Sequence, residues 1–151
     1  MNPKWLHLAF LILFLFLILP VDGHVPISAE NNYNVNTALS IEKSLKSYVI
    51  YGHLHDAGDV GYCQFIMNPG DRLTLSLMTA GFDAPVPDMV VMSLGNHGKI
   101  ENLSQAVTVP TGYTAEFIKE QQQDTAEYEP FSPAAIYEVA SYSKNITTPG
   151  T

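Results

Sequence analysis

Histidine is the residue type in this chain best suited to bind a transition metal, and two histidines stand only two positions apart. His53 and His55 lie in a segment rich in aromatic and β-branched residues, which favours a strand with both side chains on one face. Cleavage after Gly23 would make His24 the new N-terminus, with an α-amine and an imidazole together. Such nitrogen ligands suit Cu(II), so His24, His53 and His55, joined by His97 from a glycine-rich loop, form one hypothetical copper site. The simpler interpretation is that these histidines face solvent or are satisfied in the core.

Acidic residues near strand ends could hold Ca²⁺ through their hard oxygen atoms. The candidates are Glu30, Asp56, Asp59 and Asp71. The sequence contains no Asp-x-Asp-x-Asp-Gly loop. Asp in Asp56-Ala-Gly-Asp59 and in Pro69-Gly-Asp71 also serves turn formation without any metal, which is the interpretation we prefer.

No catalytic motif is present. The sequence has no Gly-x-Ser-x-Gly, no His-Glu-x-x-His and no phosphate-binding glycine-rich loop. Glu127 and Glu129 flank Tyr128 and could be the paired carboxylates of a glycosidase, but their spacing equally fits a solvated acidic stretch. We therefore expect a protein that is not an enzyme.

Several tyrosines are candidates for contact with carbohydrate, and two sequences match signals for N-linked glycosylation. If several tyrosines share an exposed face, they could stack on sugars; the candidates are Tyr48, Tyr51, Tyr62, Tyr113, Tyr128 and Tyr137. Asn102-Leu-Ser104 and Asn145-Ile-Thr147 match the acceptor pattern for N-linked glycans in an exported chain. Asn102 and Asn145 are thus candidate glycosylation sites.

The single cysteine, Cys63, cannot form a disulfide within the chain. It stands in an apolar strand pattern between Tyr62 and Phe65. A buried, unreactive thiol is the expectation.

Composition excludes several classes of protein. The chain has 151 residues, with seven Lys and Arg against fifteen Asp and Glu, for a formal net charge of −8. A nucleic-acid partner is not expected, because binding to phosphates needs clustered basic residues. The many aromatic and branched apolar residues argue against disorder, and the length predicts one domain.

The N-terminus has the pattern of a secretory signal peptide. Lys4 precedes twelve apolar residues, Leu8 to Leu19, and Pro20 follows them. We predict a signal peptide over residues 1–23, with an uncleaved anchor as the alternative. Removing those residues takes away one basic and one acidic residue, so the net charge stays at −8. Either way the protein is expected to be secreted or at the cell surface.

Downstream of the leader the chain predicts strands and almost nothing else. Residues 24–46 are polar and predicted irregular, and residues 47–151 form the expected domain. The predicted strands are 47–55, 61–67, 72–78, 89–94, 106–109, 113–118 and 135–142, of which the last could also be a short helix. Residues 119–129 are predicted to be an acidic loop. Short strands separated by turn signals predict an all-β, antiparallel β-sandwich.

Several of these pieces together resemble the pre-peptidase C-terminal (PPC) domain family. They are Glu30-Asn31-Asn32, Thr37-Ala38, Tyr48 to Gly52, Gly58-Asp59-Val60, Tyr62-Cys63-Gln64-Phe65 and Pro69-Gly70-Asp71-Arg72-Leu73. The closest likeness is to a variant in uncharacterised exported archaeal proteins. The resemblance implies a jelly-roll-like sandwich that serves as an accessory module in contact with extracellular carbohydrate or a protein matrix. Calcium bound by the linker and nearby loops, as in some members, is also implied.

The sequence departs from that family in two places. The second acid usual after the first is missing in Asp59-Val60-Gly61-Tyr62. The chain also ends at Pro149-Gly150-Thr151, where members continue into another strand. We therefore expect that the sequence is a fragment, and that membrane contact would come only through the leader or a lost C-terminal anchor.

Overall fold

The computed structural model describes residues 23–95, 103, 106–121, 125–128 and 135–148, and these residues form an all-β fold. The predicted leader lies outside the described residues except for Gly23. Nine strands and one short 3₁₀ helix, η1, follow one another along the described chain. Their bounds are β1 Val25–Ser28, η1 Val35–Thr37, β2 Leu39–Ile41, β3 Tyr48–Tyr51, β4 Cys63–Phe65, β5 Arg72–Ala80, β6 Met89–Leu94, β7 Tyr113–Ile118, β8 Glu127–Tyr128 and β9 Ala135–Asn145.

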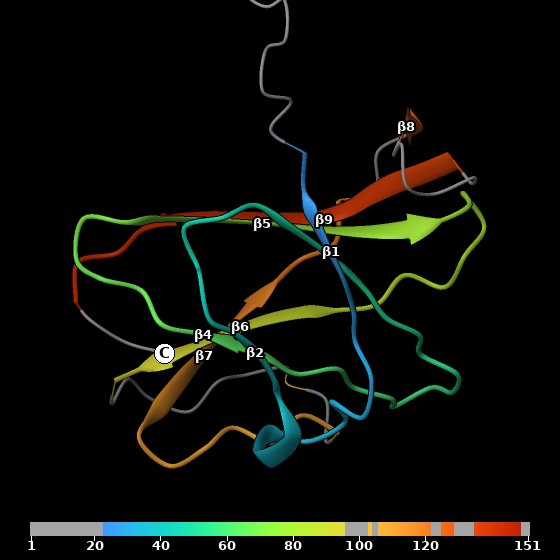
Figure 1. Ribbon diagram of the computed structural model, residues 1–151. Coiled ribbons are helices and arrows are strands. Elements are labelled where there is room, and N and C mark those ends of the chain that lie inside the picture. Colours follow the sequence, from blue (N-terminus) through green and yellow to red (C-terminus); the bar gives the residue numbers. More distant parts are fainter. Residues whose placement is uncertain (1–22, 96–102, 104–105, 122–124, 129–134, 149–151) are drawn as a thin grey trace, which may run out of the picture.

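The two largest antiparallel groups of strands lie in separate layers (Figure 1). One layer is the sheet β5-β9-β8, and the other contains the pair β6-β7. The phenol of Tyr142 on β9 donates to the Glu116 carboxylate on β7 at 3.0 Å, and Lys144 lies 3.7 Å from the same carboxylate. The predicted all-β class with antiparallel sheets is confirmed, and the layers are consistent with a sandwich.

β5 forms as its alternating sequence predicts. Leu73, Leu75 and Leu77 are half-buried, whereas every second residue from Arg72 to Ala80 is exposed. One apolar face and one polar face are typical of an antiparallel strand that covers a core on one side only. β5 pairs with β9 along its whole length.

A β-bulge in β9 changes which side chains face the core. Leu77 pairs with Ala140 and Met78 with Glu138, so Val139 is the extra residue and has no partner on β5. Its side chain is completely buried, and its carbonyl accepts the backbone N–H of Gln121 at 2.8 Å. The bulge therefore adds an apolar residue to the core while its backbone carbonyl stays hydrogen-bonded.

Two local predictions are corrected and one alternative is resolved. Residues 106–109, predicted as a strand, contain none, and the predicted loop 119–129 contains the short strand β8. The alternative of a helix near residues 135–142 is wrong, because this segment lies within β9 and pairs with both β5 and β8. Pairing across the chain outweighs the helix propensity of the alanines there.

The segment 24–46, predicted to be irregular, contains two strands. β1 pairs with β3 and β2 pairs with β4, and both pairs are parallel. Between them the Asn34 side chain accepts the backbone N–H groups of Asn36 and Thr37, which caps η1. These strands are stabilised by pairing with residues far along the sequence, which a local polar composition does not reveal.

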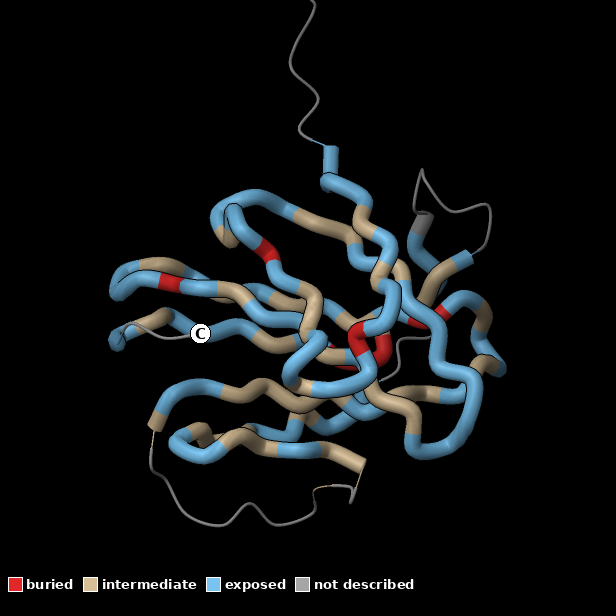
Figure 2. The backbone as a smooth tube through the Cα atoms, turned by 60° about the horizontal axis from the view of Figure 1, so that its bottom comes forward, coloured by how far each residue is buried: buried red, intermediate tan, exposed pale blue. Residues whose placement is uncertain are grey.

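Few described residues are fully buried, as the red segments of Figure 2 show. The buried apolar residues are Ile41, Met67, Val139 and Ala140, and the buried polar ones are Asn32 and Thr79. Most other inward-facing residues are only half-buried. Truncation of any one of these buried side chains should therefore lower the stability of the fold.

No helix within the described part of the chain is both long and apolar enough to span a membrane.

Candidate functional site

The predicted histidine ligands lie in two different surroundings. The ring of His24, just before β1, hydrogen-bonds through Nδ1 to the hydroxyl of Ser47 at 2.6 Å. His53 and His55 lie in the loop after β3, exposed, with ring centroids 6.3 Å apart and planes 17° from parallel. His97 lies outside the described residues.

No group of three or more His, Cys, Asp or Glu that could hold a metal ion is found among the described residues. His24 thus does not join His53 and His55 in a cluster of this size, and Glu30, Asp56, Asp59 and Asp71 do not form one either. The copper site and the calcium site predicted from these residues therefore remain predictions, and the geometry does not support them.

Two of the acidic residues instead stabilise turns. The Asp59 carboxylate accepts the backbone N–H groups of His55 at 2.7 Å and Asp56 at 3.0 Å. These hydrogen bonds hold the pKa of Asp59 below its usual value, with a smaller contribution from the His55 ring. The Asp71 carboxylate accepts the N–H of Asn68 at 2.8 Å in the same manner. This geometry supports the preferred interpretation of turn formation.

Five of the six candidate tyrosines are half-buried and offer no fully exposed platform. They are Tyr48, Tyr51, Tyr62, Tyr113 and Tyr137. The side chain of Tyr128 lies outside the described part of the structure. Tyr62 has a structural contact, because its phenol oxygen accepts the backbone N–H of Thr108 at 2.9 Å. Their placement therefore does not favour the stacking on sugars that the sequence suggested.

Cys63 is exposed, so the prediction of a buried thiol is wrong. It lies on β4, in a two-stranded sheet with β2. Although the residue as a whole is exposed, neighbouring atoms partly desolvate the thiol and raise its pKa. A raised pKa lowers the thiolate fraction at neutral pH, and the thiolate is the reactive form.

Of the two predicted glycosylation sites, Asn145 is the last residue of β9 and is exposed. Asn102 lies outside the described residues.

The outer face of the β5-β9 pair carries a ladder of polar side chains that sequence reasoning missed. In register across the two strands, Arg72 lies opposite Asn145, Thr74 opposite Ser143, and Ser76 opposite Ser141. All six residues are exposed. We call these six residues the polar ladder.

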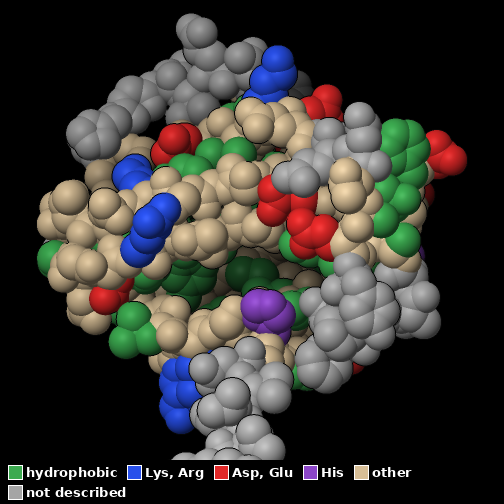
Figure 3. All heavy atoms as spheres, turned by 90° about the horizontal axis from the view of Figure 1, so that it is seen from above, with side chains coloured by type: hydrophobic (Ala, Val, Ile, Leu, Met, Phe, Trp, Pro, Cys, Tyr) green, Lys and Arg blue, Asp and Glu red, His purple; other side chains and the backbone are tan. Residues whose placement is uncertain are grey.

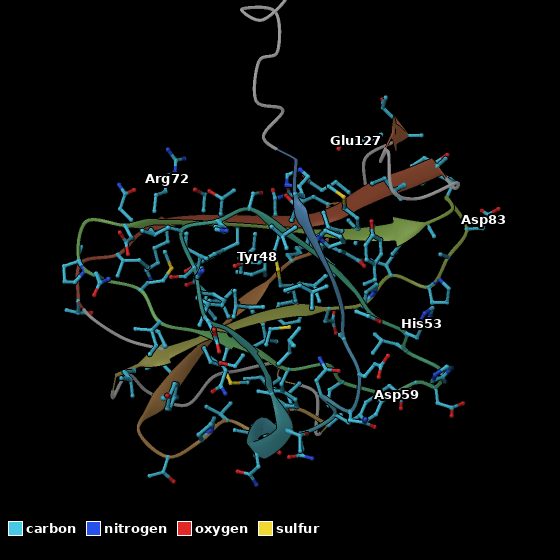
Figure 4. All side chains as sticks on the ribbon, viewed as in Figure 1. Tyr48, His53, Asp59, Arg72, Asp83 and Glu127 are labelled. Atoms are coloured by element: carbon cyan, nitrogen blue, oxygen red, sulfur yellow. The ribbon has the colours of Figure 1, made fainter. Side chains whose placement is uncertain are left out.

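Hydrogen bonds tie the polar ladder together. Arg72 Nε donates to Ser143 Oγ at 3.0 Å, and the hydroxyls of Thr74 and Ser143 lie 3.5 Å apart. The Arg72 side chain points away from the second layer (Figure 4). Seen from above, this side of the molecule shows a broad band of uncharged polar and backbone atoms with acidic and basic side chains around it (Figure 3).

The half of the polar ladder that lies on β5 could have been predicted from the sequence. The strict alternation from Arg72 to Met78 marks Arg72, Thr74 and Ser76 as one polar face, just as it marks the leucines as the apolar one. What no local pattern reveals is that the serines of 141–143 lie beside them, because that register is set by pairing across some 70 residues of chain.

A second candidate is a hollow at β2 and β4 with a volume of about 370 Å³. It is lined by Ser40, Ile41, Glu42, Gln64, Phe65 and Ile66. Ile66 is 65% exposed and Leu45 80% exposed, which leaves apolar surface at this end of the molecule. Ser44 Oγ donates to the carbonyl of Ile66 at 2.6 Å and joins the two segments.

Comparison with known proteins gives no relative from which a function could be carried over. No family model matches the chain. Neither a curated protein nor a solved structure matches it. The resemblance to the PPC family remains a prediction from the quoted motifs.

Proposed function

We propose that this chain is an exported, non-catalytic β-sandwich module that binds carbohydrate chains at the cell surface through the polar ladder of the β5-β9 sheet. The observation that carries the proposal is the register of Thr74 with Ser143 and of Ser76 with Ser141 on an exposed face. The leader pattern of residues 1–23 supports export.

The chemistry of the ladder suits a ligand rich in hydroxyl groups. Serine and threonine hydroxyls both donate and accept hydrogen bonds, and Asn145 and Arg72 add amide and guanidinium donors. A hydroxyl-rich polymer offers the same two functions along its length. Because consecutive residues of one face repeat about every 7 Å along a strand, the ladder presents its groups in a row to an extended ligand.

The backbone under the ladder is held in place before any ligand binds. β5 pairs with β9 over its full length, and Arg72 and Thr74 contact Ser143. Groups that are already ordered lose little conformational entropy on binding, which favours affinity. The six ladder residues include no carboxylate or imidazole for proton transfer, so the face is suited to binding rather than to hydrolysis.

The test is binding of the purified chain to immobilised neutral polysaccharides, comparing two matched double variants. Thr74→Val with Ser143→Ala removes two ladder hydroxyls. Ser93→Ala with Thr114→Val removes the hydroxyl pair that lies 3.4 Å apart between β6 and β7, in the other layer. Two lost hydrogen bonds of about 0.5–1.5 kcal/mol each should weaken binding about 5- to 150-fold in the ladder variant.

The control variant should bind like the unaltered chain. Equal binding by both variants would exclude the ladder as the site. Absence of binding to every neutral polysaccharide would refute the carbohydrate proposal itself.

A further inference from the structure

The exposed loop after β3 holds two imidazole rings side by side. His53 and His55 are two residues apart, both exposed, with ring centroids 6.3 Å apart and planes 17° from parallel. In an extended segment, residues at this spacing project to the same side. Neither ring is part of the polar ladder, so this pair is independent of the proposed function.

The backbone that carries the second ring is anchored. The carboxylate of Asp59 accepts the N–H of His55 at 2.7 Å and that of Asp56 at 3.0 Å, and the N–H of Asp59 donates back to the carbonyl of Asp56 at 3.1 Å. Gly58 supplies the positive φ of 102° that this turn needs. Figure 4 shows His53 and Asp59 at the same side of the molecule. The turn therefore anchors the backbone of His55, two residues after His53.

We propose that His53 and His55 form a two-imidazole site for a divalent transition metal, Cu(II) most strongly, with water completing the coordination. Imidazole nitrogen is a ligand for Cu(II) and Zn(II), and in the order of affinities copper exceeds zinc. Two imidazoles that bind one ion at about 2.0–2.1 Å per nitrogen hold their ring centroids roughly 6 Å apart or less. The observed separation of 6.3 Å is close to that limit, and because both side chains are exposed, their rings can turn out of the stacked arrangement so that one nitrogen of each faces a shared ion.

Negative charge near the pair favours a dication here. The Asp59 carboxylate accepts the backbone N–H of His55 at 2.7 Å, and the chain as a whole carries a net charge of −8. A negative field of this kind attracts cations to the loop. Hard cations gain less, because the ligands are nitrogen atoms and not oxygen atoms.

The experiment is calorimetric titration of the untagged full chain with CuCl₂, and separately with ZnCl₂ and CaCl₂. We expect one Cu(II) per chain, weaker Zn(II) and no Ca²⁺ at this site. His53→Ala and His55→Ala should each weaken Cu(II) binding at least about tenfold, since loss of a direct ligand costs no less than loss of an outer hydrogen-bond partner does. His24→Ala is the matched control and should leave this binding unchanged.

A positioning variant separates a built site from two coincident histidines. Asp59→Ala keeps both rings but removes the acceptor that anchors His55, and it should weaken Cu(II) binding without changing the stoichiometry. Circular dichroism would confirm that every variant keeps its β-structure. Absence of Cu(II) binding, or binding that disappears with His24→Ala and persists in His53→Ala and His55→Ala, would overturn the proposal.

Discussion

Asn32 and Tyr62, 30 residues apart in the sequence, are joined by two hydrogen bonds. The backbone N–H of Tyr62 donates to the Asn32 carbonyl at 2.8 Å, and the Asn32 side-chain amide donates to the Tyr62 carbonyl at 3.1 Å. That carbonyl also accepts the N–H of Leu39 at 2.8 Å, at the start of β2. The pair therefore attaches the N-terminal segment to the residue just before β4.

Replacing Asn32 with alanine should destabilise the fold. Asn32 is buried, and a typical intramolecular hydrogen bond contributes about 0.5–1.5 kcal/mol, so a loss of that order is expected in the free energy of unfolding. Urea unfolding followed by circular dichroism would measure it. The exposed Asn36→Ala serves as control and should change stability much less. Equal effects of the two variants would mean that the Asn32–Tyr62 contact is not a structural node.

Replacing Tyr51 should not lower the free energy of unfolding, in contrast to replacing Asn32. Its phenol oxygen is buried and has no hydrogen-bond partner among the described residues. Burying a hydroxyl without a partner is costly, so Tyr51→Phe should leave the unfolding free energy unchanged or raise it by up to about 1 kcal/mol. Thermal unfolding would show an equal or higher midpoint. A clear loss of stability in this variant would indicate a partner that the described residues do not include.

Val139 should be among the positions most sensitive to truncation. Its side chain is fully buried at the bulge of β9. Val139→Ala removes two methyl groups and leaves a cavity, for an expected cost of about 1–3 kcal/mol. Val25→Ala, at a residue that is 39% exposed on β1, is the matched control and should cost far less. Similar unfolding midpoints for both variants would show that the core does not centre on the bulge.

The Tyr142–Glu116–Lys144 contact predicts a loss of stability at alkaline pH. Desolvation first, and the hydrogen bond to Glu116 second, raise the pKa of Tyr142. The pKa of Lys144 is raised too, chiefly by the charge of ionised Tyr142. Because both groups hold their protons more tightly in the folded state, their stabilisation is complete below an unfolded-state pKa of about 10 and is lost as pH rises through the folded-state values.

Tyr142→Phe should therefore flatten the decline of stability above pH 10. At neutral pH the same variant should cost at most about 1 kcal/mol, because the side chain is partly exposed. Urea unfolding at several pH values from neutral to alkaline would measure both effects. Tyr33→Phe, at a tyrosine that is 52% exposed, is the control. If the free energy of unfolding depends on pH in the same way in both variants, ionisation of Tyr142 does not cause the loss of stability at alkaline pH.

Cys63 should react slowly despite its exposure. Its raised pKa reduces the thiolate fraction, and the thiolate is the nucleophile in alkylation. The rate of reaction with iodoacetamide at pH 8 should be lower for the folded chain than for the chain unfolded in urea. When the rate is measured as a function of pH, the midpoint of its rise should lie at a higher pH for the folded chain. Faster alkylation of the folded chain would contradict the desolvation of this thiol.

Local patterns predicted the strands whose two faces differ in polarity or whose residues favour extended backbone. Residues 89–94 and 113–118 form β6 and β7 with the predicted bounds, and β5 begins at Arg72 as predicted. β3 and β4 are shorter than the predicted strands 47–55 and 61–67, since only the paired residues are held in a ladder. β1 and β2 were missed because they are only four and three residues long, within a polar segment, and their stability comes from parallel partners.

The sequence by itself determined the all-β class, the apolar face of β5, the turns at Asp59 and Asp71, and the proximity of His53 to His55. Each of these depends on residues within a few positions of one another, where backbone preferences and side-chain alternation act directly. Only the tertiary structure decided the bulge at Val139, the exposure of Cys63, the absence of His24 from a ligand cluster with His53 and His55, and the polar ladder. Those features depend on the register between distant segments, which is set by the hydrogen-bond pairing and burial of the whole fold.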